Sequence, residues 1–213
     1  MDGLAVHARR GLRDQYRPIQ SVLSADAIPQ NLAKGLIQLR PFPQIYVADL
    51  NAIQGKGGQH DVVATLTPHA EVWLDQGIGS ARQAQDLDSV TVVVGSESLP
   101  SVAEWSAIKA QIPDDRLVLS LDFDSLGAFK GPDALWLTAD LWPSRIIVMT
   151  LDRVGSSSGP DSLRLKQAQS KSATAKIYAA GGVRNMEDIA SLDAQGLSGA
   201  LIATALHDGT LFG

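Results

Sequence analysis

The chain has 213 residues, of which 45% are hydrophobic and 19% are charged, and this balance excludes a disordered polypeptide. A formal net charge of −5 without a long basic stripe argues against nucleic acid or an anionic membrane as a partner. The absence of cysteine excludes disulfides, thiolate catalysis and cysteine-bound metal, and it fits a reducing compartment, so we expect a cytoplasmic protein. The length fits a single β/α-barrel domain over residues 1–213.

Seven short apolar runs predict strands that are buried on both faces, as in a parallel sheet, because they lack polar alternation. They cover residues 44–49, 70–75, 90–95, 116–122, 145–150, 175–182 and 199–204. Helical patterns with apolar residues three to four positions apart lie between them, over residues 26–39, 98–112, 132–142, 161–170 and 185–192. This alternation predicts an α/β fold with right-handed crossovers.

A weak internal repeat distinguishes a closed barrel from an open sheet. The segment Val72–Leu87 aligns with Ile177–Leu192, 105 positions further on, with Ser80 and Asn185 as helix caps. The same order relates residues 46–51 to 147–152 and residues 92–97 to 201–206. A repeat of half the chain length predicts a TIM (β/α)8-type barrel built from two half-barrels.

The loops after the last two predicted strands read AAGGVRN and IATALHDG. Phosphate commonly binds at these loops in a β/α barrel, through backbone N–H groups and a short extra helix. Gly181 and Gly182 allow the backbone to approach an anion, and Ala203 and Thr204 begin a segment typical of the short helix. We therefore predict phosphate contacts at these four residues, although paired glycines also suit a tight turn.

Seven stretches together resemble the histidine-biosynthesis barrels, which are the HisA isomerase and the HisF cyclase. They are YVADLNA, QGIGS, VVGSES, LSLDFDSLGAFKG, DRVGSSSGPD, AAGGVRN and GALIATALHDG. The chain looks most like a HisA-like branch found in methanogens and methylotrophs and associated with tetrahydromethanopterin-linked one-carbon metabolism. The resemblance implies two phosphate sites at opposite edges of the barrel mouth, acid–base chemistry by two aspartates, and neither metal nor cofactor.

The isomerase of this family opens a ribose amine to a Schiff base and removes the proton on C2, which requires one acidic and one basic group. The resemblance assigns one of these roles to Asp122, at the end of its predicted strand, and a turn-capping role is the alternative. Asp49, Asp152 and Thr150 are further candidates for the site.

The second carboxylate of the family ends its first strand, in a pattern of Asp, an apolar residue, two variable residues and Gly. The opening MDGLAVHARRG matches only the tail of this pattern, with Gly3 at the glycine position and Asp2 at a variable one. We therefore expect strand 1 and its aspartate to be missing before Met1, either because the start is assigned too late or because the chain has seven strands. In the second case, residues 4–8 are the segment available to replace the strand.

Departures at the family's sixth strand, which is the run 145–150 in this chain, argue against the cyclase reaction and a glutaminase partner. Val154 stands where the cyclase has a functional aspartate, and Met149 stands at the position of the family's threonine. Thr150 lies one place along, so its side chain should point to the opposite face of the strand.

The first phosphate loop also departs from the family, because DQGIG puts Asp75 and Gln76 where glycines are usual. Gly95 and Ser96 still offer a backbone donor and a hydroxyl donor. We expect one good phosphate site, one altered or lost site, and a small metabolite with a single phosphate as ligand.

Three functions remain open at the level of sequence. The first is an isomerase-type enzyme for a phosphoribosyl compound. The second is a diverged enzyme of tetrahydromethanopterin-linked cofactor biosynthesis, and the third is a ligand-binding barrel without catalysis. A metal site is not expected, because the four histidines lack ligand spacing; they are His7, His60, His69 and His207.

Overall fold

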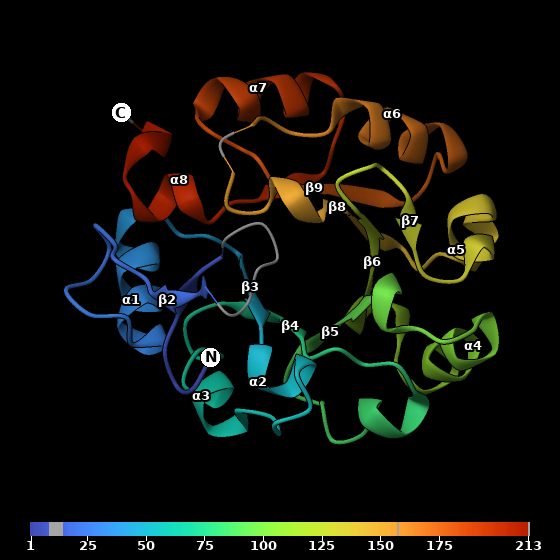
Figure 1. The fold of residues 1–213 in the computed structure, drawn as a ribbon, viewed down its shortest axis with the longest axis horizontal. Helices are drawn as coiled ribbons and strands as arrows, with labels where there is room; N and C mark the ends of the chain where they lie inside the picture. The colour runs from blue at the N-terminus through green and yellow to red at the C-terminus, as the bar shows by residue number, and fades with distance from the viewer. Residues whose placement is uncertain (9–14, 157, 213) are drawn as a thin grey trace.

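The computed structural model describes residues 1–8, 15–156 and 158–212 and shows strands arranged in a ring with helices outside it (Figure 1). The ring contains seven parallel strands, one for each predicted run. They are β3 (Gln44–Ala48), β4 (Glu71–Asp75), β5 (Thr91–Gly95), β6 (Leu117–Phe123), β8 (Arg145–Thr150), β9 (Lys176–Ala180) and β10 (Gly199–Leu201). The prediction of a TIM-type β/α barrel is therefore confirmed.

The strands follow one another in the order β10-β9-β8-β6-β5-β4-β3, and the short β7 (Phe129–Lys130) pairs antiparallel with β6. Within the described part of the chain, β3 and β10 each pair with one strand only. The barrel is thus nearly closed, with an opening between β3 and β10.

Helices cover the outside of the ring, and all five predicted helical patterns begin near a cap residue or proline. The α-helices are α1 (Pro29–Leu39), α2 (Leu50–Ile53), α3 (His60–Ala64), α4 (Val102–Gln111), α5 (Asp133–Leu137), α6 (Ser162–Lys171), α7 (Met186–Ala194) and α8 (Thr204–His207). The 3-10 helices are η2 (Ala81–Ala84), η3 (Ser96–Ser98), η4 (Asp114–Arg116), η5 (Ala139–Leu141), η6 (Leu151–Arg153) and η7 (Thr210–Phe212).

The helix caps differ between the two halves of the repeat. Ser101, Asp161 and Asn185 each accept a hydrogen bond from a backbone N–H in the first turn of α4, α6 and α7. Ser80 makes no such bond and precedes only the 3-10 turn η2, so the prediction that it caps a helix is wrong. The α8 helix appears where the short extra helix was expected.

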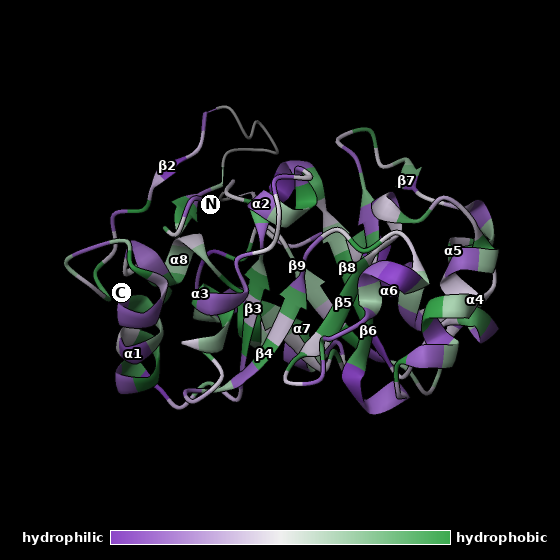
Figure 2. Cartoon of the chain, turned by 90° about the horizontal axis from the view of Figure 1, so that it is seen from below, coloured by the Kyte–Doolittle hydropathy of each residue, from purple (hydrophilic) through white to green (hydrophobic). Residues whose placement is uncertain are grey.

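The core has two layers, one inside the ring and one between the ring and the helices. Inside lie Trp73, Val93, Val118, Ile147 and Ala180. The larger outer cluster joins the other strand faces to the helices, so apolar residues gather on the strands and hydrophilic residues on the outer surface (Figure 2). No helix among the described residues has the length and apolar character needed to cross a membrane.

The amino-terminal segment does not join the barrel sheet. Within residues 4–8, β1 (Val6–His7) pairs antiparallel with β2 (Arg17–Pro18) in a separate two-stranded ribbon. The backbone of Ala5 is bonded to Ala27 and Ile19. Since these local partners use the backbone groups that a barrel strand needs, the expectation that residues 4–8 replace strand 1 is wrong.

Candidate functional site

A cavity of about 690 Å³ lies at the carboxyl ends of the strands and continues down between β3 and β10. Loops after strands of both halves line it, as expected for the mouth of a β/α barrel. The lining includes four candidates from the sequence that share one edge of the mouth, namely Gly181, Gly182, Ala203 and Thr204.

Asp122 lies inside the ring at the carboxyl end of β6 and is only 3% exposed. Its Oδ1 accepts a hydrogen bond from the Ser120 hydroxyl (2.6 Å), and its Oδ2 accepts one from the backbone N–H of Glu97 (3.2 Å). Because Glu97 lines the cavity, the Asp122 carboxyl lies one hydrogen bond away from the lining.

Burial raises the pKa of Asp122 from its ordinary value of 3.8 to about 7. The hydrogen bond from Ser120 opposes this rise, whereas the negative charges of Asp75 and Glu97 add to it. A carboxyl group with this pKa is present in both its acidic and its basic form near neutral pH, which suits it to transferring protons.

Gly95 and Ser96 hold Asp122 in place. A Cβ atom at Gly95 would lie 3.1 Å from Asp122 Oδ2, so the missing side chain leaves room for the carboxylate. The Ser96 hydroxyl accepts from the backbone N–H of Asp122 (3.0 Å) and donates to the carbonyl of Lys130 (2.6 Å) on β7. The structure thus gives both residues contacts with the carboxylate or its strand, and their predicted role in phosphate binding stays a prediction.

Asp75 and Tyr46 form a second polar pair in the cavity, which the sequence did not reveal. The Tyr46 hydroxyl donates to Asp75 Oδ2 (2.9 Å), and the backbone N–H of Gly77 donates to Oδ1 (3.0 Å). Burial, with the charge of Asp75, raises the pKa of Tyr46 well above its ordinary value, so the phenol stays neutral. In the structure Tyr46 pairs with Trp73, so it lies on the inner face that Trp73 and Asp75 share. The sequence signal for this pair is a polar residue at an inward position in each of two neighbouring strands.

Asp49 lies at the same mouth but caps a helix. It is 2% exposed, and its carboxylate accepts from the backbone N–H groups of Asn51 (3.1 Å), Ala52 (3.2 Å) and Gln59 (2.6 Å). Burial alone would raise the pKa of Asp49, but these bonds outweigh burial and lower it. The side chain is therefore an ionised N-cap of α2 that also lines the cavity.

Thr150 is the last residue of β8, and Asp152 lies two residues further on, in η6. Thr150 pairs in register with Phe123 and donates to Asp161 (3.0 Å), whereas Met149 pairs with Asp122 and shares its inner face. Thr150 therefore points to the outer face, as its position in the strand predicted. Asp152 Oδ1, in η6, is buried and has no hydrogen-bond partner among the described residues.

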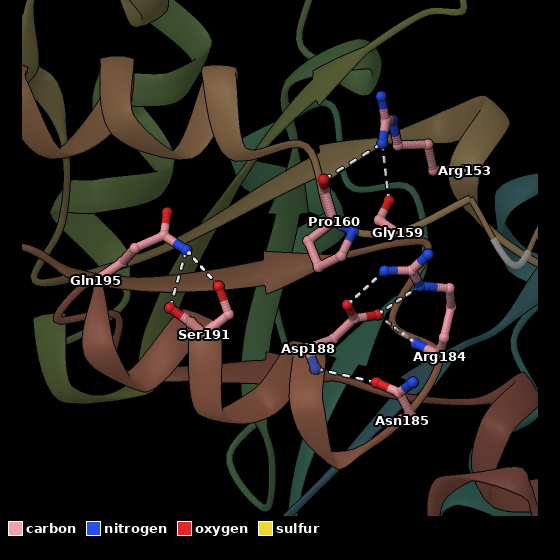
Figure 3. A network of polar contacts seen from close by, with 8 residues as sticks. All are labelled: Arg153, Gly159, Pro160, Arg184, Asn185, Asp188, Ser191 and Gln195. Atoms are coloured by element: carbon pink, nitrogen blue, oxygen red, sulfur yellow. Dashed lines mark hydrogen bonds and ion pairs between the residues drawn. The ribbon is translucent and has the colours of Figure 1, made fainter.

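The loop after β8 is bonded to the loop after β9, which carries Gly181 and Gly182. The N–H of Gly159 donates to the carbonyl of Gly182 (3.0 Å), and Arg153 donates to the carbonyls of Gly159 (2.8 Å) and Pro160 (3.3 Å) (Figure 3). Gly181 and Gly182 have φ values of +94° and +83°, which favour glycine.

Below this loop, Arg184 forms an ion pair with Asp188 (2.8 Å), and the side chain of Asn185 caps α7 (Figure 3). Ser156, in the serine-rich SSSG stretch, also lines the cavity, and its hydroxyl donates to the carbonyl of Arg153 (3.0 Å). No group of three or more histidine, aspartate and glutamate side chains in the described ranges is arranged to hold a metal ion.

Comparison with known proteins gives a family match over nearly the whole chain. The family described as "Histidine biosynthesis protein" matches residues 1–211. An uncharacterized protein of Methanocaldococcus jannaschii is 30% identical over 213 residues, which span 99% of this chain and 91% of the relative.

Named isomerases match the chain at lower identity than the archaeal relative. An isomerase of Myxococcus xanthus, named for a phosphoribosyl imidazole-4-carboxamide, is 28% identical over 80% of this chain and 77% of its own length. Phosphoribosyl isomerase A of Mycobacteroides abscessus is 26% identical over 78% of this chain and 76% of its own length.

Proposed function

The chain belongs to the histidine biosynthesis family, in the HisA/HisF group of barrels, and from this premise we propose that it is an isomerase-type enzyme acting on a phosphorylated small molecule. The observation that carries the proposal is the buried Asp122 carboxyl, at the mouth of a barrel whose relatives include named isomerases. Proton transfer is the chemistry we assign to it, and side chains of the protein suffice for that chemistry.

Asp122 is the group that exchanges a proton with the substrate. Its pKa of about 7 allows it to give up a proton and take it back without a large energetic cost at neutral pH. Ser120 and the N–H of Glu97 fix the two carboxyl oxygens, so that the carboxyl group keeps one orientation during the transfer.

The phosphate of the substrate binds at the edge formed by Gly181, Gly182, Ala203 and Thr204. Backbone N–H groups near glycine and the hydroxyl of Thr204 are donors suited to phosphate, and these residues line one cavity. The opposite edge holds the carboxylate of Asp75, which repels a second phosphate. A phosphoribosyl compound with one phosphate near this edge fits both features, and neither nucleic acid, a membrane nor a glutaminase subunit is required.

The test is an isomerisation assay with the substrate of the related isomerases. The Asp122→Asn variant should lose at least about 100-fold in kcat with little change in KM, because it removes proton transfer rather than binding. Asp124→Asn is the matched control, since Asp124 lies two residues away and accepts bonds only from its own turn, at Leu126 and Ala128. Full activity of Asp122→Asn would refute the assigned role, and a wild-type protein without turnover would refute this substrate.

One observation favours a second candidate. The uncharacterized archaeal relative is 30% identical over 99% of this chain, whereas a named isomerase of Streptococcus sanguinis that spans the same share of the chain is 24% identical. This distribution suits a branch with its own substrate, for which we propose an enzyme of tetrahydromethanopterin-linked one-carbon cofactor biosynthesis. Deletion of the gene distinguishes the candidates, because a histidine requirement supports the first and loss of the pterin cofactor supports the second.

A further inference from the structure

The last residues of β6 reach beyond the end of β5. In the ladder between these strands, β5 stops at Gly95, which pairs with Ser120, whereas β6 continues to Phe123. Because β8 occupies the other edge of β6 as far as its end, the place of β5 is taken by β7, in which Lys130 pairs with Asp122. On this edge the backbone of Asp122 is therefore held by a short hairpin and not by a strand of the barrel.

The base of the β6–β7 hairpin is packed against the barrel. The Phe129 ring of β7 lies 5.5 Å from the Phe123 ring and 6.4 Å from the Trp136 ring, measured between centroids. The Ser96 hydroxyl, directly after β5, donates to the carbonyl of Lys130 (2.6 Å). Apolar contacts and a buried hydrogen bond thus fix this part of the hairpin.

The tip of the hairpin, residues 124–128, is largely open to solvent. Leu126 at its centre is 92% exposed. The Asp124 carboxylate accepts from the N–H groups of Leu126 (3.0 Å) and Ala128 (2.9 Å), so its bonds stay within the tip. These bonds give the turn its shape, but its position against the barrel depends on a contact from another element.

Arg164 of α6 provides that contact. Its Nη2 donates to the carbonyl of Gly127 (2.7 Å), and its guanidinium lies over the Phe123 ring (5.3 Å from Cζ to the centroid), so one side chain holds the tip and the strand end together (Figure 1). Gln167, further along the same helix, accepts from Nη1 (3.0 Å) and orients the group. A Cβ atom at Gly127 would collide with Nη2, because the tip and the guanidinium are in close contact.

The helix that carries Arg164 is itself fixed at the mouth of the barrel. Asp161 caps α6 by accepting from the backbone N–H of Arg164 (3.1 Å), and it also accepts from the hydroxyl of Thr150 at the end of β8 (3.0 Å). The Arg164 side chain therefore extends from a fixed point. Arginine suits this place because its planar guanidinium can stack on a ring and donate to two acceptors at once.

The position of the hairpin matters for Asp122 in two ways. Pairing with β7 fixes the backbone from which the carboxyl projects, and a misplacement of about 1 Å in a catalytic group can cost roughly 100-fold in rate. With the hairpin in place the carboxyl is also only 3% exposed. Displacement of the hairpin would leave the end of β6 with a free edge and let water reach the carboxyl.

We propose that Arg164 is a positioning residue for the reaction assigned to Asp122, because it holds the β6–β7 hairpin against the barrel and so keeps the end of β6 in place. The inference rests on the proposed function only for its effect on turnover. Arg164 lies outside the lining of the cavity, and it acts through Gly127 and β7 rather than by touching the substrate.

The test replaces Arg164 by methionine, which keeps an apolar contact with Phe123 but cannot donate to Gly127. Two readouts need no substrate: the pKa of Asp122, measured by NMR of its carboxyl carbon, and the exchange of the amide hydrogens of residues 124–130. In Arg164→Met the pKa of Asp122 should fall by about 1, because water reaches the carboxyl, and the amides should exchange at least about tenfold faster. In the isomerisation assay, kcat should fall about tenfold or more with little change in KM.

Lys109→Met is the matched control. Lys109 also lies over an aromatic ring, that of Trp105 (5.9 Å), and donates to a loop carbonyl, that of Leu141 (3.1 Å), but both partners lie outside the hairpin. It should leave the pKa of Asp122, the exchange in the hairpin and kcat unchanged. Arg164→Lys keeps a cation and a donor at the same place and should restore most of each readout. Gly127→Ala is a second variant, which displaces Nη2 from the opposite side and should reproduce the effects of Arg164→Met.

Three outcomes would overturn the proposal. Unchanged exchange in the hairpin of Arg164→Met would show that the tip keeps its position without the guanidinium. A rise in the pKa of Asp122 would show that Arg164 acts as a nearby positive charge and not through the hairpin. Equal changes in Lys109→Met would show a general loss of stability. A wild-type protein without turnover would overturn the proposed function alone, because the first two readouts are measured without substrate.

Discussion

At the scale of single residues, the burial of Asp122 lowers the stability of the fold when its carboxyl is ionised. Its carboxyl is buried beside two other acidic side chains, and the donors that contact it among the described residues are neutral, namely the hydroxyls of Ser120 and Ser96 and the backbone of Glu97. Such a site favours the protonated form, and it costs stability whenever the carboxyl ionises. A residue that served only the fold would gain nothing from this arrangement.

The sign of this cost gives a prediction for the pH dependence of stability. The folded pKa of about 7 lies above the ordinary value of 3.8, so the native state holds the extra proton between these values. The contribution of Asp122 therefore lowers the free energy of unfolding as pH rises from about 4 to about 7, and is constant above. Asp122→Asn removes this loss. The free energy of unfolding of the variant minus that of wild type should therefore rise by on the order of 2–3 kcal/mol from pH 5 to pH 8.

Urea unfolding of both proteins at pH 5 and pH 8 measures this difference. The comparison isolates Asp122 and the charges coupled to it, because titrating groups that do not interact with Asp122 contribute equally to the two proteins. His207 is one of them, since burial lowers its pKa, and Asp49 is another. Parallel stability curves for wild type and variant would mean that Asp122 does not carry a raised pKa.

At the scale of elements, the loop after β8 is fixed on the loop after β9 through Gly182. A Cβ atom at Gly182 would collide with the carbonyl of Gly159, and the residue has a φ of +83°. Gly57 has a similar φ of +93°, but no atom lies within 4 Å of its Cβ position. Gly57→Ala should cost about 1–2 kcal/mol of unfolding free energy for the backbone alone, and Gly182→Ala about 1–3 kcal/mol more for the collision.

Urea unfolding of the two alanine variants tests this difference in cost. Equal losses would mean that the loop containing Gly159 moves away freely and is not held against the glycine pair. A larger loss at Gly182 would show that the two loops form one unit, which would hold the predicted phosphate donors in a fixed position.

The elements also show what the sequence could predict. All seven parallel strands were predictable, because a strand buried on both faces leaves an uninterrupted apolar run such as 117–123. The absence of an α-helix after Ser80 was not predictable from the cap residue, since an N-cap residue begins a helix only when the following residues can continue it. The position of Asp122 at a strand end was predictable, but its contacts with Ser96 and Glu97 were not, because they depend on register between β5 and β6.

At the scale of the whole molecule, the two halves meet at the bottom of the barrel as well as at the mouth. Arg145, at the start of β8, forms an ion pair with Glu71, at the start of β4 (3.1 Å), and its guanidinium lies over the Trp73 ring (5.3 Å). The Arg145 side chain is 12% exposed, and Glu71 also accepts from Thr91 (2.6 Å). The contact joins the two halves of the repeat across the interior.

This ion pair should contribute more than an ordinary surface pair, because the Arg145 side chain is largely buried and lies over Trp73, so water screens the charges less. A double-mutant cycle with Arg145→Met and Glu71→Gln should give a coupling of about 1–2 kcal/mol in unfolding free energy. The matched cycle uses Arg116 and Asp88, which form an equally short pair (3.2 Å) with side chains 30% and 98% exposed, and should give about 0.5 kcal/mol or less. Equal couplings in the two cycles would mean that burial does not strengthen the ion pair between Arg145 and Glu71.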